Sequence, residues 1–183
     1  ALGPAAYIGR ARVVPLRNMG AAISPFNAFL ILQGIETLAL RMDRICTNSI
    51  KIARFLKDHP KCSWVNYAGL EDHKDYPLVQ KYMGGRASGI LNFGVKGTNC
   101  GGREGGGREG GGKFQDALKL VTRLVNIGDC KTLACHPAST THRQLNDEEL
   151  AKAGVPRDMI RLSIGIEHID DLIADLDQAL SVV

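Results

Sequence analysis

The chain has 183 residues, of which 44% are hydrophobic and 23% are charged. That composition suits one or two small globular domains with a buried core, and it excludes an intrinsically disordered chain. The net charge of +4 at pH 7 is small, and the basic residues are spread along the chain, so no dense basic patch indicates a nucleic-acid-binding protein.

The cysteines and the lack of long apolar runs indicate a cytoplasmic protein. Five cysteines are an odd number without the spacing of a disulfide framework, which favours reduced thiols. No stretch of 18 uninterrupted apolar residues is present, which predicts no membrane span. The opening ALGPAAYIGRARVV lacks the regions of a signal peptide. We expect these first residues to be the end of a longer segment.

The first predicted element is a long helix. Ser24 is a suitable N-cap, and Pro25 at the first helical position loses no hydrogen bond. Apolar residues then recur at alternating spacings of four and three on one stripe, which ends near His59. The stripe is Ile31, Ile35, Leu38, Met42, Ile45, Ser49, Ile52 and Leu56. At 1.5 Å per residue this helix is roughly 45 to 50 Å long, so we expect it to bridge two domains or pack against a partner subunit.

From residue 61 onward, shorter elements predict an α+β layer. Alternating apolar residues predict strands over 62–67, 89–97, 131–135 and 159–167. Helical spacing predicts helices over 113–125, with a buried stripe of Phe114, Leu118, Val121 and Val125, and over 170–180; a capping box from Asn146 to Glu149 predicts a short helix between them. The expected fold is a small, mostly antiparallel sheet with helices on one face and the second face free.

Arg161 belongs to that second face. In the strand around it, Ile160, Leu162, Ile164 and Ile166 alternate with Met159, Arg161, Ser163 and Gly165. A guanidinium on a rigid strand beside small residues is a good fork for a carboxylate. The alternative is a solvated arginine, or one paired with a surface acid.

Three blocks carry a resemblance to a known family: SPFNAFLILQGIETLALRMDR, NIGDCKTLACHPASTTHRQL and IRLSIGIEHIDDLIADL. Together they resemble the C-terminal half of the Cys/Met-metabolism family of pyridoxal-phosphate enzymes. The resemblance implies the fold type I transferase fold, with residues 1–60 as the end of the large cofactor domain and the interdomain helix. Residues 61–183 would be the small, substrate-binding domain.

Asn126 of the NIG motif, with SPFNAF and HPASTTH, resembles the O-acetylhomoserine sulfhydrylase branch, which makes homocysteine from O-acetylhomoserine and sulfide. The resemblance implies that Arg161 and Asn126 bind the carboxylate of a small amino-acid substrate, and that Thr141 supports the arginine. It also implies a homo-oligomer in which Arg17 and Asn18 contact a neighbouring subunit.

Alternatives stay open at this point. The chain resembles cystathionine γ-synthases and γ-lyases as well, and the substrate is not decided among these branches. No lysine in the sequence has the context of the family's Schiff-base lysine, so we expect no catalytic residue and no activity from this chain alone, with the pyridoxal 5'-phosphate site mostly absent. A truncated homologue that acts through its long helix as an oligomerisation module is the second hypothesis.

The stretch CKTLACHPASTTH gathers cysteine, histidine and hydroxyl side chains at residues 130–142. We predict no metal site there, because Cys135, His136 and His142 lack a fourth ligand at zinc spacing. Cys130 and Cys135 are expected to pack as small apolar residues, and His136 to have a structural role in a turn.

GREGG occurs twice in tandem, at 102–106 and 107–111. The pattern predicts a long glycine-rich loop over 97–112, since such a loop costs little closure entropy. An RNA-binding Arg/Gly box is the alternative. Only two arginines are present, each followed by glutamate and without interleaved aromatic residues, which disfavours it.

Overall fold

A computed structural model describes residues 3–96 and 107–183, in two compact units, 1–39 and 40–183. The first unit consists of short helical pieces: η1 (Gly3–Ala5), α1 (Ala6–Ala11), the π-helical turn η2 (Arg12–Leu16), α2 (Arg17–Met19) and α3 (Pro25–Glu36). None of these elements contains a buried residue. The predicted cap of α3 is confirmed, because the backbone N–H of Asn27 donates to Ser24 Oγ at 3.2 Å.

The single long helix predicted from residue 24 is wrong: it is two helices, α3 and α4 (Leu38–Asp58). At Thr37 the backbone has φ −101° and ψ 2°, outside the helical range, and its N–H donates to the carbonyl of Ile35. The stripe is buried only in its second half, at Ile45, Ser49, Ile52 and Leu56. In the first half, Ile31, Ile35 and Leu38 are exposed, and α3 contains no buried residue.

The second unit contains a five-stranded sheet in the order β1-β2-β5-β4-β3. The strands are β1 (Cys62–Asn66), β2 (Ile90–Val95), β3 (Thr122–Arg123), β4 (Leu133–Cys135) and β5 (Met159–Ser163). Three of the four pairings are antiparallel and only β3–β4 is parallel, so the predicted sheet is confirmed. The boundary of this unit lies within α4, whereas the sequence places the domain boundary at residue 60.

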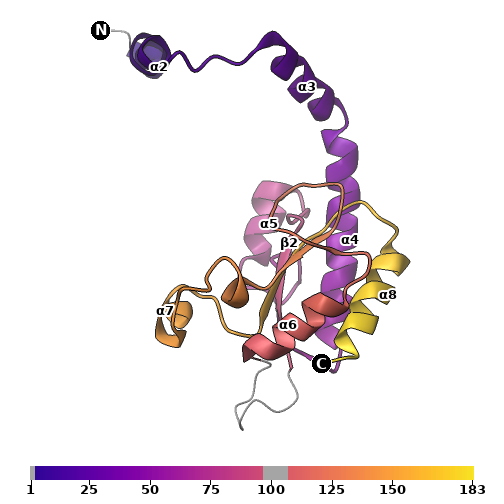
Figure 1. The fold of residues 1–183 in the computed structure, drawn as a ribbon. Helices are drawn as coiled ribbons and strands as arrows, with labels where there is room; N and C mark the ends of the chain where they lie inside the picture. Colours follow the sequence, from indigo (N-terminus) through magenta and orange to yellow (C-terminus); the bar gives the residue numbers. More distant parts are fainter. Residues whose placement is uncertain (1–2, 97–106) are drawn as a thin grey trace. The chain divides into compact units, whose positions relative to one another are not determined.

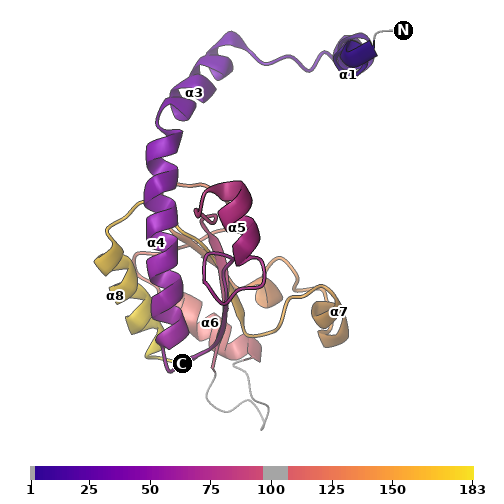
Figure 2. The same ribbon diagram turned by 180° about the vertical axis from the view of Figure 1, so that it is seen from behind.

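One face of the sheet carries the hydrophobic core. α4, α6 (Gly107–Ala117) and α8 (Ile169–Leu180) cover it, and α4 and α8 lie side by side in both ribbon views (Figure 1, Figure 2). Alternate strand residues point toward these helices, as the period of two requires. They are Leu91, Phe93, Val95, Ile160 and Leu162. Phe93 meets Phe114 of α6 edge-on, with ring centroids 5.5 Å apart. Ile166, predicted for the same face, lies beyond the strand and is 37% exposed.

α6 is shifted toward the N-terminus relative to the helix predicted over 113–125. It ends at Ala117, and Thr122–Arg123 form β3 instead. The reason is Asp175 of α8, whose carboxylate accepts the backbone N–H groups of Lys119, Leu120 and Val121. A continuing helix would donate those groups to its own carbonyls. Val125, predicted for the buried stripe, is 47% exposed.

The predicted glycine-rich loop is wrong over residues 107–112, which form the first half of α6. The remainder of that prediction, 97–106, lies outside the described residues. Gly111 packs directly on His136: a Cβ at that position would be 2.5 Å from the imidazole Nε2. The glycine therefore permits the close approach of helix and ring.

The second face of the sheet is covered at one end. There, α7 (Asp147–Lys152) and the 3₁₀ turn η3 (Pro137–Ser139) bring together a small cluster of Ala138, Leu150, Val155 and Met159, on which Trp64 of β1 packs. The capping box of α7 is confirmed, with Asn146 and Glu149 each accepting the other's backbone N–H. A further helix, α5 (Tyr76–Met83), was not predicted.

Candidate functional site

The uncovered part of the second face centres on Arg161 in the middle of β5. In the antiparallel register Arg161 is opposite Asn92 of β2 on one side and Cys135 of β4 on the other. We call Asn92, Arg161 and Cys135 the arginine row. Directly opposite residues on neighbouring strands share a face, so these three side chains leave the sheet on the side away from α4, α6 and α8.

The Arg161 guanidinium is largely uncommitted. Its one hydrogen bond within the described residues is long, from Nη2 to the backbone carbonyl of Asn126 at 3.4 Å. The described residues contain no carboxylate within ion-pair distance of it, although other arginines, such as Arg123 and Arg157, are paired with acids. Arg161 therefore keeps most of its five N–H donors available for a ligand.

Asn126 reaches the arginine row through a loop between β3 and β4. Its Oδ1 accepts the backbone N–H of Ile127 at 2.9 Å, and Gly128 turns the chain with φ of 80°. This leaves the amide Nδ2 without a hydrogen-bond partner in the described part of the chain. The structure brings the backbone carbonyl of Asn126 to Arg161; the predicted shared role of the two side chains in binding a carboxylate stays a prediction.

A buried hydrogen-bond network holds the ends of β4 and β5, and the sequence analysis missed it. Glu167 accepts both the backbone N–H of Thr132, at 2.6 Å, and its hydroxyl, at 2.8 Å. Thr132 Oγ1 accepts the N–H of Gly165 at 2.9 Å, and Asn48 of α4 donates to the carbonyls of Gly165 and Glu167. The only sequence signal was a polar residue, Asn48, beside the apolar stripe of α4. This network fixes the strand that carries Arg161 against the core.

Two other predicted site elements lie elsewhere. Thr141 Oγ1 is 2.8 Å from Nδ1 of His142, and the described residues show no hydrogen bond between Thr141 and Arg161. Its neighbour Thr140 is the residue that reaches the arginine row, with Oγ1 3.2 Å from Cys135 Sγ. Arg17 and Asn18 are exposed on α2, in the first unit.

Of the cysteines and histidines in residues 130–142, His136 and Cys135 are buried. His136 is fully buried, with Nδ1 2.7 Å from Ser139 Oγ and Nε2 2.7 Å from the carbonyl of Arg157, so the predicted structural role is confirmed. Cys135 is buried as predicted, but Cys130 is exposed, because it lies in the loop after Gly128. The four cysteines in the described residues are free thiols. Burial raises the pKa of the Cys62 thiol to about 12.

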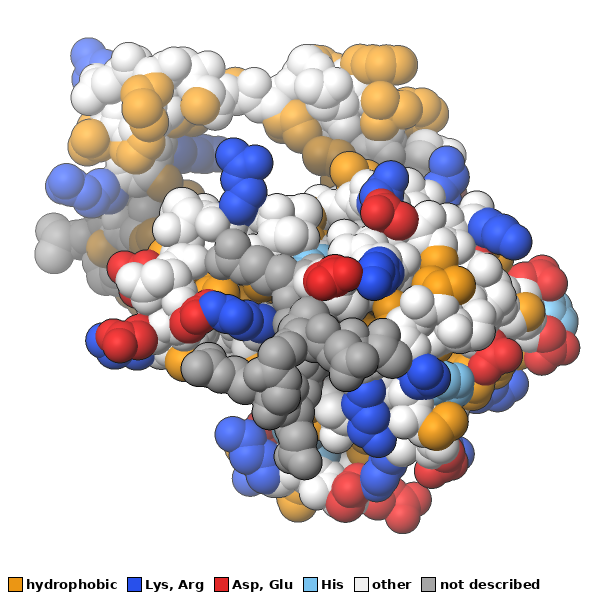
Figure 3. All heavy atoms as spheres, turned by 60° about the horizontal axis from the view of Figure 1, so that its bottom comes forward, with side chains coloured by type: hydrophobic (Ala, Val, Ile, Leu, Met, Phe, Trp, Pro, Cys, Tyr) orange, Lys and Arg blue, Asp and Glu red, His pale blue; other side chains and the backbone are white. Residues whose placement is uncertain are grey.

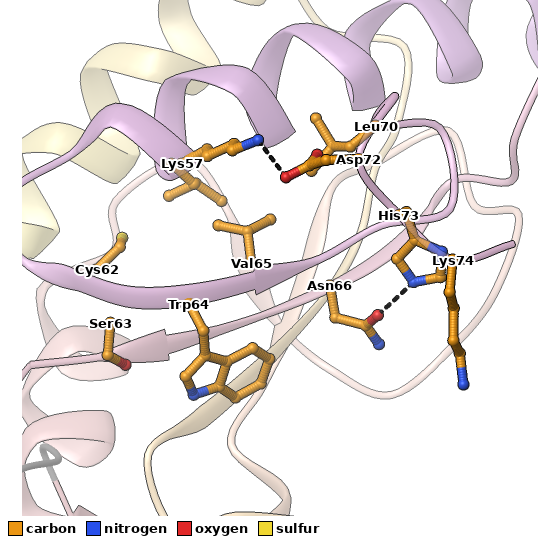
Figure 4. Close-up of a pocket in the computed structure, with 11 residues that line it drawn as sticks. Lys57, Cys62, Ser63, Trp64, Val65, Asn66, Leu70, Asp72, His73 and Lys74 are labelled. Carbon is orange, nitrogen blue, oxygen red and sulfur yellow. Dashed lines mark hydrogen bonds and ion pairs between the residues drawn. The ribbon is translucent and has the colours of Figure 1, made fainter. Parts of the chain in front are cut away.

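A cavity of about 520 Å³ lies along β1, away from Arg161, between α4 and the loop that contains His73 (Figure 4). Two of its charged groups are paired: Lys57 Nζ donates to Asp72 at 2.6 Å. Lys74 also lines the cavity. His73 Nε2 donates to Asn66 Oδ1 at 2.8 Å. These contacts commit four of the polar residues that line the cavity to one another.

None of the described helices is long and apolar enough to cross a membrane. The fold is an α+β layer whose second sheet face carries an uncommitted arginine, a class of domain suited to binding a small anion. A family model described as Cys/Met metabolism PLP-dependent enzyme matches residues 6–181, and the chain belongs to this family. The resemblance read from the sequence is therefore confirmed.

Relatives and a solved structure agree. The chain is 47% identical over 180 residues to the homocysteine synthase of Schizosaccharomyces pombe, covering 98% of this chain and 40% of that protein. It is 51% identical over 176 residues to the O-acetyl-L-homoserine sulfhydrylase of Leptospira meyeri, covering 96% and 38%. The crystal structure of a putative O-acetylhomoserine (thiol)-lyase from Campylobacter jejuni, which contains N'-pyridoxyl-lysine-5'-monophosphate, matches with a TM-score of 0.84 and 42% identity, covering 96% and 40%. The chain thus spans about two fifths of their length.

The arginine row by itself does not form a pyridoxal-phosphate site. Such a site needs a lysine amine and donors for the phosphate in one concavity. The arginine row contains no lysine. Two lysines, Lys57 and Lys74, line the cavity along β1, where the Lys57 amine is bound to Asp72 and its side chain is 47% exposed. What the described residues offer chemically is the binding and orientation of a carboxylate.

Proposed function

We propose that this chain is the substrate-binding part of a pyridoxal-phosphate enzyme that makes homocysteine from O-acetylhomoserine and sulfide. In that reaction sulfide replaces the acetoxy group, and acetate leaves. The cofactor supplies an electron sink for the carbanions when it is bound. The family assignment and the relatives' names support this proposal, which includes residues 61–183 as the substrate domain and a cytoplasmic location.

The observation that carries the proposal is the uncommitted Arg161. A strand arginine that binds no ligand would pair with a nearby acid or extend into solvent. Arg161 is instead half-buried, with one long hydrogen bond and no carboxylate partner in the described residues. Its fork can therefore accept both oxygens of a substrate carboxylate.

The other roles proposed here follow from the same assignment. Asn126 would add one donor to the carboxylate, since its Oδ1 is held by the Ile127 N–H and its Nδ2 is the group left for a ligand. Thr141 would help to orient Arg161. Arg17 and Asn18 would contact a neighbouring subunit of a homo-oligomer.

The test is a chimera that joins this chain to the N-terminal part of the Thermus thermophilus O-acetyl-L-homoserine sulfhydrylase 1, which is 46% identical over 181 residues. Arg161→Lys keeps the charge and loses the planar fork; Arg161→Ala loses both. A charge-assisted pair of hydrogen bonds contributes about 2 to 4 kcal/mol, so kcat/KM should fall roughly thirty- to a thousandfold in the alanine variant.

Arg123→Ala is the matched control, because Arg123 is paired with Asp116 and is 58% exposed. It should leave the kinetics unchanged. Wild-type kcat/KM in Arg161→Ala would defeat the assignment of the substrate site. Comparing O-acetylhomoserine with O-succinylhomoserine and cystathionine in the same chimera separates the sulfhydrylase from the cystathionine-synthase and lyase branches.

A second candidate function, an oligomerisation module without activity, is favoured by α3. Its large apolar side chains are exposed on all sides, among them Phe26, Phe29 and Leu32 at 68%, 55% and 60%. Hydrophobic side chains gather on the N-terminal helices in the space-filling view (Figure 3). A helix that is apolar all round is normally enclosed by protein. Sedimentation of the chain and of an Ile31→Lys, Ile35→Lys variant tests this: only the unsubstituted chain should self-associate.

A further inference from the structure

Asn92 has a buried polar atom without a partner. Its Oδ1 is the one buried side-chain oxygen or nitrogen among the described residues that forms no hydrogen bond. Burying a carbonyl oxygen without a donor is costly, and native proteins rarely leave such a group unsatisfied. An orphan acceptor at the centre of a sheet therefore points to a donor that arrives when the site is occupied.

The nearest source of donors in the fold is Arg161. The two residues are direct partners in the β2–β5 pairing, so their side chains leave the same face about 5 Å apart at Cβ. Arg161 has five N–H groups, and its described hydrogen bond to the Asn126 carbonyl is long, at 3.4 Å. Moving the guanidinium from that carbonyl toward Asn92 thus breaks only a weak contact.

We propose that Asn92 is a positioning residue: its Oδ1 accepts one N–H of Arg161 when the guanidinium holds the substrate carboxylate. This rests on the proposed function. On the sheet side of the guanidinium, the Asn92 amide fixes its plane. The N–H groups on the opposite side of the guanidinium then face the carboxylate. Because the amide is neutral, it orients the arginine without cancelling the charge that attracts the substrate.

The next position along the same line of residues provides a contrast. Asn66 of β1 is opposite Asn92, but its Oδ1 already accepts a hydrogen bond from His73 Nε2 at 2.8 Å. Two asparagines on adjacent strands thus differ in the partner of the side-chain oxygen, and Asn66 is also the more exposed of the two. Asn66→Ala is therefore a matched control for Asn92→Ala.

The experiment uses the chimera and two readouts: KM for O-acetylhomoserine, and the inhibition constant of L-norleucine, an amino acid without a leaving group. Asn92→Ala should raise both about tenfold, the value for one hydrogen bond to a charged group, with kcat changed less. Asn92→Asp should raise both further, because a carboxylate would bind the guanidinium in place of the substrate. Asn66→Ala should leave both unchanged.

The double variant Arg161→Ala, Asn92→Ala separates positioning from a structural role. If Asn92 acts through Arg161, its replacement has no additional effect once the arginine is gone. An equal effect in both backgrounds overturns the inference, as does wild-type binding in Asn92→Ala and Asn92→Asp while Arg161→Ala is impaired. Wild-type kinetics in Arg161→Ala overturns the proposed function itself. If Asn92→Ala does not fold, Asn92→Ser and Asn92→Asp give the same comparison.

Discussion

Asp175 provides the sharpest test of how the second unit is held together. Its Oδ1 accepts the backbone N–H of Lys119 at 2.9 Å and the amide of Gln178 at 3.0 Å. Its Oδ2 accepts the N–H groups of Leu120 and Val121 at 2.9 and 2.8 Å. The side chain is 6% exposed. One carboxylate thus ends α6 and starts the path to β3, as no neutral side chain of that size can.

Asp175→Asn keeps the shape and removes one acceptor oxygen and the charge. In its best orientation the amide oxygen still meets Leu120 and Val121, and the NH₂ group faces the N–H of Lys119. Two charge-assisted bonds become neutral ones, the Lys119 N–H loses its acceptor, and the Gln178 amide loses one of its three acceptors, which together should cost about 3 kcal/mol of unfolding free energy. That is a large fraction of a typical domain's stability.

The assay is urea unfolding followed by the fluorescence of Trp64, the only tryptophan, whose indole N–H donates to Asp158 at 3.1 Å. Asp171→Asn on the exposed side of the same helix is the control and should cost less than about 1 kcal/mol. Equal losses in the two variants would contradict the reasoning.

The same pair of proteins tests the pH dependence. Burial acts to raise the pKa of the Asp175 carboxyl, but the three backbone N–H groups and Gln178 outweigh it, and the pKa lies below its usual value. A depressed folded-state pKa contributes stability above the unfolded value of about 3.9, and that contribution is lost as the pH falls through the folded value. The stability difference between wild type and Asp175→Asn should be constant above about pH 5 and shrink below pH 4. A constant difference down to pH 3 would refute the charge-based account.

Other predictions concern α6 and the thiols. Gly111→Ala places a methyl group 2.5 Å from the His136 imidazole and should destabilise the fold by about 1 to 3 kcal/mol. A methyl group at Gly112 meets nothing within 4 Å, so Gly112→Ala should stabilise α6 by up to about 1 kcal/mol. Urea unfolding that ranks the two variants in reverse would be inconsistent with this packing. Deleting residues 107–111 yields the same sequence as deleting the preceding GREGG copy, so α6 can begin with identical residues. The unfolding free energy should therefore change by less than about 0.5 kcal/mol. A loss of several kcal/mol would mean that both copies are needed. With a disulfide reagent at pH 8, the exposed Cys130 should react in the folded chain and Cys62 only on unfolding, and mass spectrometry that finds Cys62 labelled first would contradict its burial.

The sequence predicted the elements that are determined by residues close to one another in the chain. Alternation identified β2 and β5 and their buried face, and the capping box identified α7. The arginine was found because it stands on the polar side of that alternation. Asn126 came from the family motif, and the structure brings its carbonyl to Arg161.

The errors arose where distant residues decide the outcome. The end of α6 is set by Asp175, more than fifty residues away, and no periodicity near residue 118 reveals it. The network around Glu167 joins residues as far as 119 positions apart. Asn92 looked like an ordinary polar strand residue, and only the register opposite Arg161 and the unbonded oxygen distinguish it. At Thr37 the backbone leaves the helical range within an unbroken apolar stripe, so the periodicity does not reveal this break.

β2 and β5 separate two tasks on alternate residues. Phe93 and Ile160 face the helices and sit fully buried, while Asn92 and Arg161 face the other side. Substitutions on the second side can alter which anion is held without disturbing the packing that keeps the domain folded. Such a sheet lets a lineage change the residues of one face by single steps, each starting from a stable fold.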